Sequence, residues 1–166
     1  METLIIDFSS PDEQEQWEII NDAVMGGLSS SRISIIENKA ALFQGNVSLE
    51  NYGGFASMRT HPRSFDIEGS TGLILKVKGD GKDYRIRLRT DTSYEGIAYQ
   101  AHFSTETDRW IIARLPFEAF TPVYRGEIIA DAPALDLNAI QRVGIMIADK
   151  QEGSFRLEIE WIKAYT

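Results

Sequence analysis

Apolar and polar residues alternate with a period of two along most of the chain, which is typical of strands that bury one face. Leu73 to Lys78 and Tyr84 to Thr90 show the alternation most clearly, and turn-forming residues such as Gly79-Asp80-Gly81 lie between such segments. The strands predicted from this pattern are 4–8, 32–36, 41–49, 55–60, 73–78, 84–90, 98–104, 110–115, 143–148 and 155–162.

Helical patterns are short. Ser10-Pro11-Asp12-Glu13 has the composition of a helix N-terminus, so a short helix is expected to run from there toward Trp17. A second helical turn is expected near Leu137 to Gln141, after Asp136. About ten strands without long intervening helices predict an all-β fold, an antiparallel sandwich or jelly roll. Since no repeat, linker or low-complexity run divides the sequence, residues 1–166 are predicted to form a single domain.

Composition supports a globular chain and narrows the chemistry. Of the 166 residues 43% are hydrophobic and 25% are charged, and there is no cysteine, which excludes disulfides, thiolate zinc sites and cysteine nucleophiles. The sequence has no run of ~20 apolar residues and no secretory signal pattern, so we expect a cytoplasmic protein without membrane insertion. The formal charge of -8 repels nucleic acids and anionic membranes, so binding to either requires a local basic patch.

Two loops share an asparagine followed by a glycine doublet: NDAVMGGLSS, residues 21–30, and LENYGGF, residues 49–55. A phosphate-binding loop needs glycines that lead into a helix, together with a lysine or the helix dipole. Here the glycines lead into predicted strands and no GK[ST] motif follows, so both loops are predicted to form tight corners. The loop residues to which we assign this structural role are Asn21, Asp22, Met25, Gly26, Gly27, Asn51, Gly53 and Gly54.

Further motifs follow in a characteristic order along nearly the whole chain. They are Trp17, NDAVMGGLSSS at 21–31, FQGNVSLENYGGFASMR at 43–59, VKGDGKDY at 77–84, Trp110, LPFEAF at 115–120, YRG at 124–126, Ile145 and DKQEGSF at 149–155. This series resembles the complex I intermediate-associated protein 30 family, the assembly factors of NADH:ubiquinone oxidoreductase and their bacterial relatives. The resemblance implies a galactose-binding-like jelly roll and a chaperone-like assembly role, and it carries over no catalytic residues. Plant relatives with this domain imply a role in photosystem assembly as another possibility.

Outward-facing basic residues are concentrated on the predicted strands 73–78 and 84–90. The turn from Gly79 to Asp83 between them is short, so we expect the two strands to pair as a hairpin and to form one basic patch. The following strands are expected to add polar and aromatic residues to it. The candidate partner-binding residues are Lys76, Lys78, Arg85, Arg87, Arg89, Gln100, His102, Trp110 and Arg114.

The basic patch has two interpretations. Its side chains can be ordinary solvated residues that discourage edge pairing and meet acids such as Glu158 and Glu160. Alternatively, mutual repulsion of the cations favours a partner that supplies negative charge: an acidic protein surface, an RNA backbone or an anionic ligand.

Catalytic and metal sites are not indicated. His61 and His102 are the only histidines and form no recognisable triad, and the turn aspartates do not follow a calcium-loop spacing, so we expect no enzyme activity, metal or cofactor. Trp17, Trp110 and Trp161 are most simply structural anchors. Three hypotheses remain open: a protein-binding module that assists assembly of a respiratory or photosynthetic complex, a carbohydrate-binding module, and an RNA-binding module that uses the basic hairpin.

Overall fold

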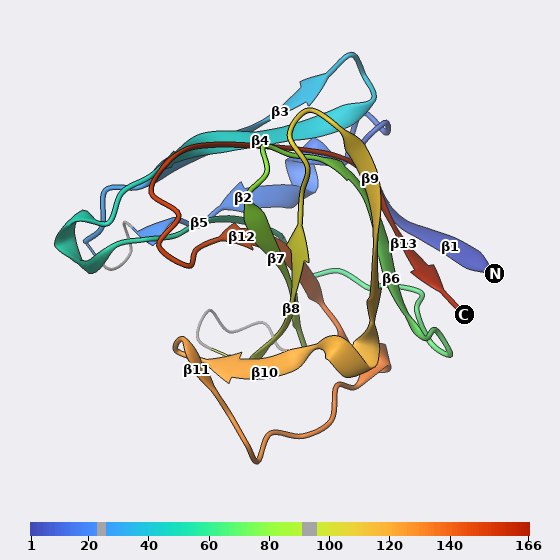
Figure 1. Cartoon of the computed structure of the whole chain (residues 1–166). Helices are drawn as coiled ribbons and strands as arrows, with labels where there is room; N and C mark the ends of the chain where they lie inside the picture. The colour runs from blue at the N-terminus through green and yellow to red at the C-terminus, as the bar shows by residue number, and fades with distance from the viewer. Residues whose placement is uncertain (23–25, 91–95) are drawn as a thin grey trace.

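The computed structural model describes residues 1–22, 26–90 and 96–166, with Tyr52 described by its backbone alone. Two antiparallel sheets pack face to face (Figure 1). The first sheet has six strands in the order β3-β4-β13-β6-β9, and β1 also pairs with β13. Its strands are β1 (Glu2–Asp7), β3 (Ser30–Ile36), β4 (Ala40–Val47), β6 (Gly72–Lys78), β9 (Trp110–Pro116) and β13 (Gly153–Tyr165).

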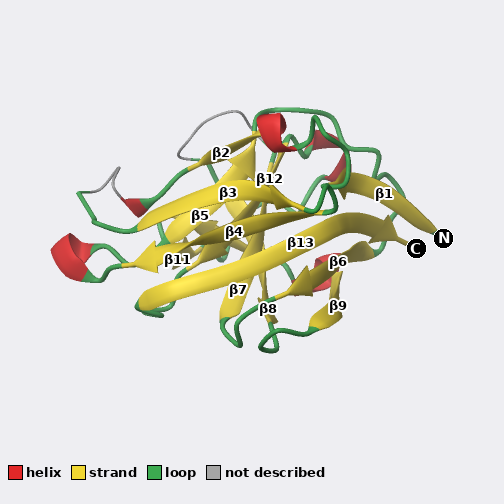
Figure 2. Cartoon of the chain, turned by 90° about the horizontal axis from the view of Figure 1, so that it is seen from above, coloured by secondary structure: helices red, strands yellow, loops and turns green. Residues whose placement is uncertain are grey.

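The second sheet has seven strands in the order β11-β10-β8-β7-β12-β5-β2. They are β2 (Trp17–Ile19), β5 (Ala56–Thr60), β7 (Asp83–Arg89), β8 (Ala98–Ser104), β10 (Thr121–Tyr124), β11 (Glu127–Ile128) and β12 (Arg142–Ile147). The helices of the described residues are single 3-10 turns at Gln14–Gln16 (η1), Glu50–Tyr52 (η3), Phe117–Ala119 (η4) and Leu137–Ala139 (η5). Figure 2 shows how the long strand β13 crosses the first sheet between its neighbours. The predicted all-β jelly-roll architecture is confirmed.

The hydrophobic core lies between the sheets, on the faces that the alternation predicts. Leu73, Leu75 and Val77 of β6 are completely buried, as are Tyr84 and Ile86 of β7. Each large apolar side chain removed from water contributes about 1.5–3 kcal/mol to folding. Aromatic side chains link strands of both sheets through the ring pairs Phe43–Phe155, Tyr84–Phe103 and Tyr84–Phe155.

The predicted hairpin of residues 73–78 and 84–90 is wrong. β6 pairs with β9 and β13, whereas β7 pairs with β8 and β12 in the other sheet. The connection that follows Lys78 therefore carries the chain from one sheet to the other. As a consequence the outward side chains of β6 and those of β7 lie on opposite outer faces of the sandwich, and the predicted single basic patch does not exist.

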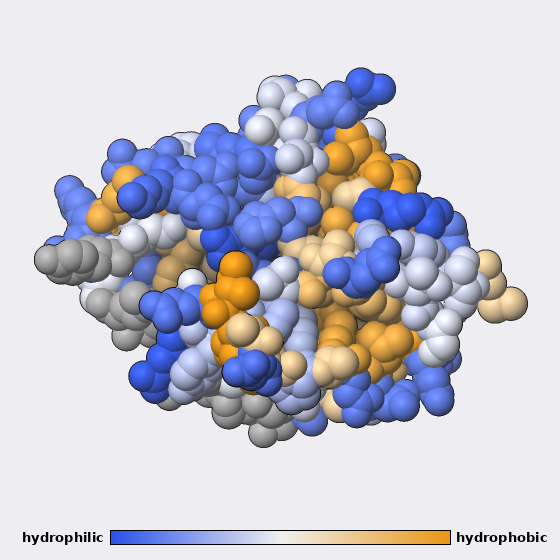
Figure 3. Space-filling model, turned by 60° about the horizontal axis from the view of Figure 1, so that its bottom comes forward, coloured by the Kyte–Doolittle hydropathy of each residue, from blue (hydrophilic) through white to orange (hydrophobic). Residues whose placement is uncertain are grey.

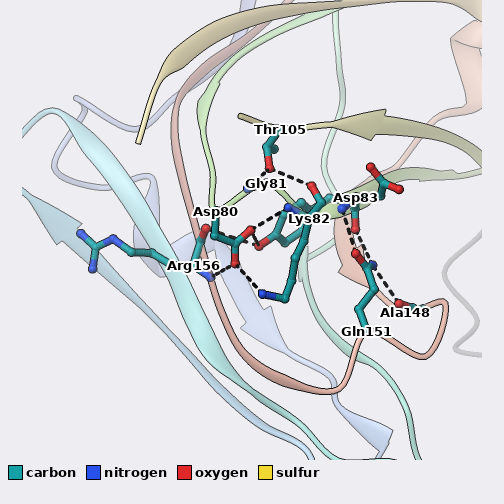
Figure 4. Close-up of polar contacts among 9 residues, drawn as sticks. Asp80, Gly81, Lys82, Asp83, Thr105, Ala148, Gln151 and Arg156 are labelled. Atoms are coloured by element: carbon teal, nitrogen blue, oxygen red, sulfur yellow. Dashed lines mark hydrogen bonds and ion pairs between the residues drawn. The ribbon is translucent and has the colours of Figure 1, made fainter. Parts of the chain in front are cut away.

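Contacts from distant strands direct this crossing (Figure 4). The Asp80 carboxylate accepts hydrogen bonds from the Arg156 backbone amide at 2.8 Å and from the Tyr84 hydroxyl at 3.0 Å. Burial raises the pKa of Tyr84, and the neighbouring Asp80 raises it further. A Cβ atom at Gly79 would overlap the Thr105 side chain, so only glycine permits this close approach.

The shortest strands were not predicted. The helical turn expected toward Trp17 ends at Gln16, and Trp17 begins β2, opposite Thr60. β10 contains Pro122, and β11 has only two residues, so neither shows an alternation long enough to be read from sequence. The turn predicted after Asp136 is present as η5, and the Asp136 side chain accepts a hydrogen bond from the Asn138 amide.

Candidate functional site: an arginine-lined groove

The two glycine-doublet loops meet at the buried carboxylate of Asp22. Its oxygens accept hydrogen bonds from the backbone amide of Ser29 at 3.0 Å and from the Ser29 hydroxyl. They also accept from the amides of Gly54 at 2.7 Å and Phe55 at 3.2 Å. Burial acts to raise the pKa of Asp22, but the hydrogen bonds from Ser29, Gly54 and Phe55 outweigh it and hold the pKa below its ordinary value. Asp22 thus fixes the second loop against the first.

Glycine is required where these loops approach Asp22. A Cβ atom at Gly27 would overlap the Asp22 side chain, and one at Gly53 would lie 2.6 Å from Asp22 Oδ2. Gly26 and Gly54 have φ angles of 87° and 133°, which favour glycine. The predicted corner residues Asn21 and Asn51 are also placed in these loops: Asn21 Oδ1 accepts a hydrogen bond from Ser31 Oγ at 2.8 Å, and Asn51 has a left-handed φ of 55°. Met25 lies outside the described residues.

The loop held by Asp22 forms one wall of a groove of about 650 Å³ on the outer face of the seven-stranded sheet. Outward side chains of β7 form its floor, and the turns after β10 and β12 form further walls. Figure 3, which brings the β10–β11 end of the molecule forward, shows hydrophilic and hydrophobic surface side by side at that end. The residues that line the groove include Gly53, Gly54, Phe55, Arg85, Arg87, Arg89, Val123, Arg125, Met146, Asp149 and Lys150.

The strand register sets the neighbours of each floor residue. Arg87 of β7 lies between Gln100 of β8 and Gly144 of β12. Directly paired residues of antiparallel strands point to the same face, so Gly144 leaves space beside the Arg87 side chain. Arg59 of β5 follows on the other side of Gly144. Arg89 lies opposite Arg142, so guanidinium groups from three adjacent strands gather on this face.

Carboxylates neutralise some of these arginines. Glu18 Oε1 lies 3.3 Å from Arg59 Nε and 3.3 Å from an Arg142 guanidinium nitrogen. Asp149 forms an ion pair with Arg85 and lies 3.6 Å from His102 Nε2. Because charge-assisted hydrogen bonds are about twice as strong as neutral ones, these contacts fix the outer arginines of the cluster.

Arg87, at the centre of the floor, is different. In the part of the chain that the structure describes it makes no hydrogen bond or ion pair. Its Nε atom is sealed from solvent, as are those of Arg85 and Arg142. Burial lowers the pKa of Arg87 to about 10, and the positive charges of Arg89, Arg85 and Arg59 contribute to this shift. Arg87 remains protonated at neutral pH, and none of the residues that the structure describes forms an ion pair with it.

The other predicted binding residues lie on the outer face of the six-stranded sheet. Lys76 and Lys78 form ion pairs with Glu160 at 2.7 Å and Glu158 at 3.3 Å. Both lysines also lie over the Trp110 ring, with their Nζ atoms 5.6 and 5.5 Å from its centroid. The Arg114 guanidinium lies 4.2 Å from the centroid of the Tyr165 ring. Only Arg85, Arg87, Arg89, Gln100 and His102 of the predicted set belong to the seven-stranded sheet.

Several residues of the groove face, on the seven-stranded sheet, were not predicted from the sequence. Alternation along 142–147 places Arg142, Gly144 and Met146 on one face, so their common orientation could have been predicted. The neighbours of that face could not, because the order of strands in a sheet depends on contacts between distant segments. Arg59 and Glu18 were missed for the same reason.

The described residues were also searched for metal sites and for membrane-spanning helices. Within residues 1–22, 26–90 and 96–166 there is no cluster of three or more metal-ligating side chains. None of the described helices has the length and apolar character that a membrane crossing needs. Trp17, which was expected to be a structural anchor, is buried in the core at 6% exposure.

The architecture matches known jelly-roll modules. A family 11 carbohydrate-binding module from Clostridium thermocellum superposes with a TM-score of 0.73 at 16% identity, covering 99% of this chain and 95% of that one. The agarase AgWH50C superposes with a TM-score of 0.66 at 8% identity, and the match covers 24% of that chain. At these identities the likeness establishes the fold alone, and it places the chain in the class of galactose-binding-like jelly-roll domains.

The sequence defines the family within that class. The profile of the complex I intermediate-associated protein 30 family matches residues 6–159, so this chain belongs to that family. The mitochondrial complex I intermediate-associated protein 30 of Drosophila melanogaster is 28% identical, and that of Mus musculus is 26% identical. Each match covers 96% of this chain but only 61% of the fly protein and 55% of the mouse protein. The prediction of a cytoplasmic protein is overturned, because these relatives are named as mitochondrial proteins.

Proposed function

We propose that this chain is a non-catalytic binding module that assists assembly of a respiratory complex of the complex I type. Its family match and the names of its relatives support this role. The structural observation that carries the proposal is the groove on the seven-stranded sheet, where the positive charge of Arg87 has no counter-charge among the described residues.

The chemistry of the groove favours binding over catalysis. Guanidinium groups recognise carboxylates and phosphates through paired hydrogen bonds, but they do not exchange protons readily at neutral pH. Among the described residues, the carboxylates of Glu18 and Asp149 reach this face, and both are paired with arginines. The described groove residues therefore suit the recognition of an anionic group better than acid–base chemistry.

Deletion of the gene in its source organism tests this role. We expect the deletion strain to accumulate less fully assembled NADH:ubiquinone oxidoreductase on native gels and to regain it when the chain is expressed from a plasmid. An unrelated respiratory complex on the same gels serves as the control. Normal levels of the assembled enzyme in the deletion strain would refute the proposed role.

A further inference from the structure

The floor of the groove repeats positive charge at the spacing of an extended polypeptide. Arg85, Arg87 and Arg89 are alternate residues of one strand, so their Cα atoms are about 6.5–7 Å apart. Alternate residues of an extended partner segment have the same spacing. Such a segment, lying along β7, can therefore present one carboxylate to each guanidinium.

No carboxylate of the described residues forms an ion pair with the central arginine. Arg87 has no described partner, whereas Arg85 is paired with Asp149. A cation that is shielded from water without a counter-charge costs stability, and a carboxylate from a ligand would offset that cost. Gly144 keeps the approach open, since it places no side chain beside Arg87. The groove is therefore complementary to negative charge at its centre.

The lining also includes apolar side chains, which bear on the kind of ligand. Phe55, Val123 and Met146 line the groove together with the arginines. A polypeptide that alternates acidic and apolar residues can meet both kinds of surface. An RNA strand gains affinity from a long basic track and from stacked aromatic rings, and the net charge of -8 opposes its approach to the rest of this surface. A neutral sugar would leave the charge of Arg87 uncompensated.

From this complementarity we propose that the groove on the seven-stranded sheet binds an extended acidic segment of a partner protein, with a carboxylate on Arg87. The inference deepens the proposed function and rests on it in one respect, since it takes the partner to be a protein. The carboxylate engages the guanidinium in a bidentate pair, and the neighbouring acidic residues of the segment lie toward Arg85 and Arg89. The loop fixed by Asp22 forms the wall that confines the segment.

Calorimetric titration of the full chain with short synthetic peptides tests the groove directly. The probe is a capped peptide with glutamate at alternate positions and valine or threonine between them, and its control carries glutamine in place of glutamate. We expect the acidic peptide to bind and the glutamine peptide to bind at least about tenfold more weakly, since charge-assisted hydrogen bonds contribute more than neutral ones. Binding should weaken as salt is raised.

Variants locate the binding surface. Arg87→Gln is expected to lower the affinity for the acidic peptide about tenfold or more. Lys78→Gln, on the opposite sheet, should leave this affinity unchanged. Thermal melts verify that both variants fold. If Arg87→Gln does not fold, Arg85→Gln is measured instead, with a smaller loss expected because Arg85 already has a carboxylate partner.

Three results would overturn the inference: no binding of the acidic peptide, equal binding by Arg87→Gln, or tighter Arg87-dependent binding of a single-stranded RNA or a neutral glucan oligosaccharide. Its failure can be distinguished from failure of the assembly role. If the groove does not bind acidic peptides but the chain still restores the assembled enzyme, only this inference is refuted. If the groove binds acidic peptides but deletion of the gene leaves assembly intact, only the assembly role is refuted.

Discussion

Asp22 accepts a hydrogen bond at 2.7 Å from the backbone amide of Gly54, which lies 32 residues further along the chain. This contact joins the two glycine-doublet loops of the sequence and sets the position of the groove wall at Gly53 to Phe55. The motif therefore has a consequence beyond turning two corners, because it links a buried carboxylate to the shape of the candidate binding surface.

Replacing that carboxylate should destabilise the fold. Asp22→Asn keeps the shape of the side chain but substitutes an amide nitrogen for one oxygen, so at least one of the buried amide donors loses its acceptor. We expect the free energy of unfolding to fall by about 2–4 kcal/mol in a urea titration. Asp12→Asn, at an exposed position, is the control and should change it by less than about 0.5 kcal/mol. Equal stability of the two variants would show that Asp22 is not a structural anchor.

The pH dependence of the unfolding free energy, compared between the unchanged protein and Asp22→Asn, tests whether Asp22 is ionised in the folded state. Its pKa in the folded protein is lowered from the ordinary value of 3.8, so ionisation of Asp22 stabilises the fold above that value. This contribution is lost as the pH falls through the lower pKa of the folded state. The difference in unfolding free energy between the unchanged protein and Asp22→Asn should thus be constant from pH 7 to about pH 5 and should shrink in more acidic buffer. A difference that grows on acidification contradicts the assignment.

Adding a methyl group at Gly27 should be costly because it would overlap the Asp22 side chain. We expect Gly27→Ala to lower the free energy of unfolding by about 2–4 kcal/mol, from overpacking and loss of the buried hydrogen bonds. Gly69→Ala is a useful comparison, since a Cβ there meets nothing within 4 Å but the φ angle is 79°. It reports the backbone strain alone, about 1 kcal/mol. Urea titrations that rank the two variants in the opposite order would contradict the packing around Asp22.

Removing the charge at Arg87 should make the protein more stable. Arg87 has no described partner for its positive charge, so Arg87→Met keeps much of the apolar stem and relieves repulsion from the neighbouring arginines. We expect a gain of about 0.5–2 kcal/mol, seen as a rise in Tm.

Arg142→Met provides the matched comparison on the same face. Arg142 is only 5% exposed and is paired with Glu18, so its replacement should lower the Tm. A lower Tm for both variants would mean that Arg87 stabilises the folded chain and is not held at a cost for binding.

The inner face of each long strand could be predicted because the period of two alone decides which side chains share a face. Leu75 and Ile86 are buried, as the alternation indicates. The sheet to which a strand belongs could not be predicted in the same way. The turn after Lys78 has a length that suits a hairpin, but contacts of Asp80 with Arg156 and of Gly79 with Thr105 direct the chain to the other sheet.

Only the part of the candidate site that lies on one strand could be predicted, because alternation fixes which side chains of a strand share a face but not which strands become neighbours. The outward orientation of Arg85, Arg87 and Arg89 follows from alternation, and their place on one strand kept them together. Their neighbours Arg142 and Gly144 come from a segment that β7 meets only in the folded sheet. The role of Asp22 likewise depends on a meeting of two loops that are far apart in sequence.

Affinity purification from the source organism measures most directly whether the arginine-lined groove is the surface through which this protein acts. The chain should be tagged and expressed unchanged, as Arg87→Glu, and as Lys39→Glu, a charge-matched control at an exposed position next to the six-stranded sheet. Quantitative mass spectrometry should recover subunits of NADH:ubiquinone oxidoreductase with the unchanged chain and with Lys39→Glu, and far less with Arg87→Glu. Recovery of the same subunits at the same level with Arg87→Glu would contradict a role for the groove.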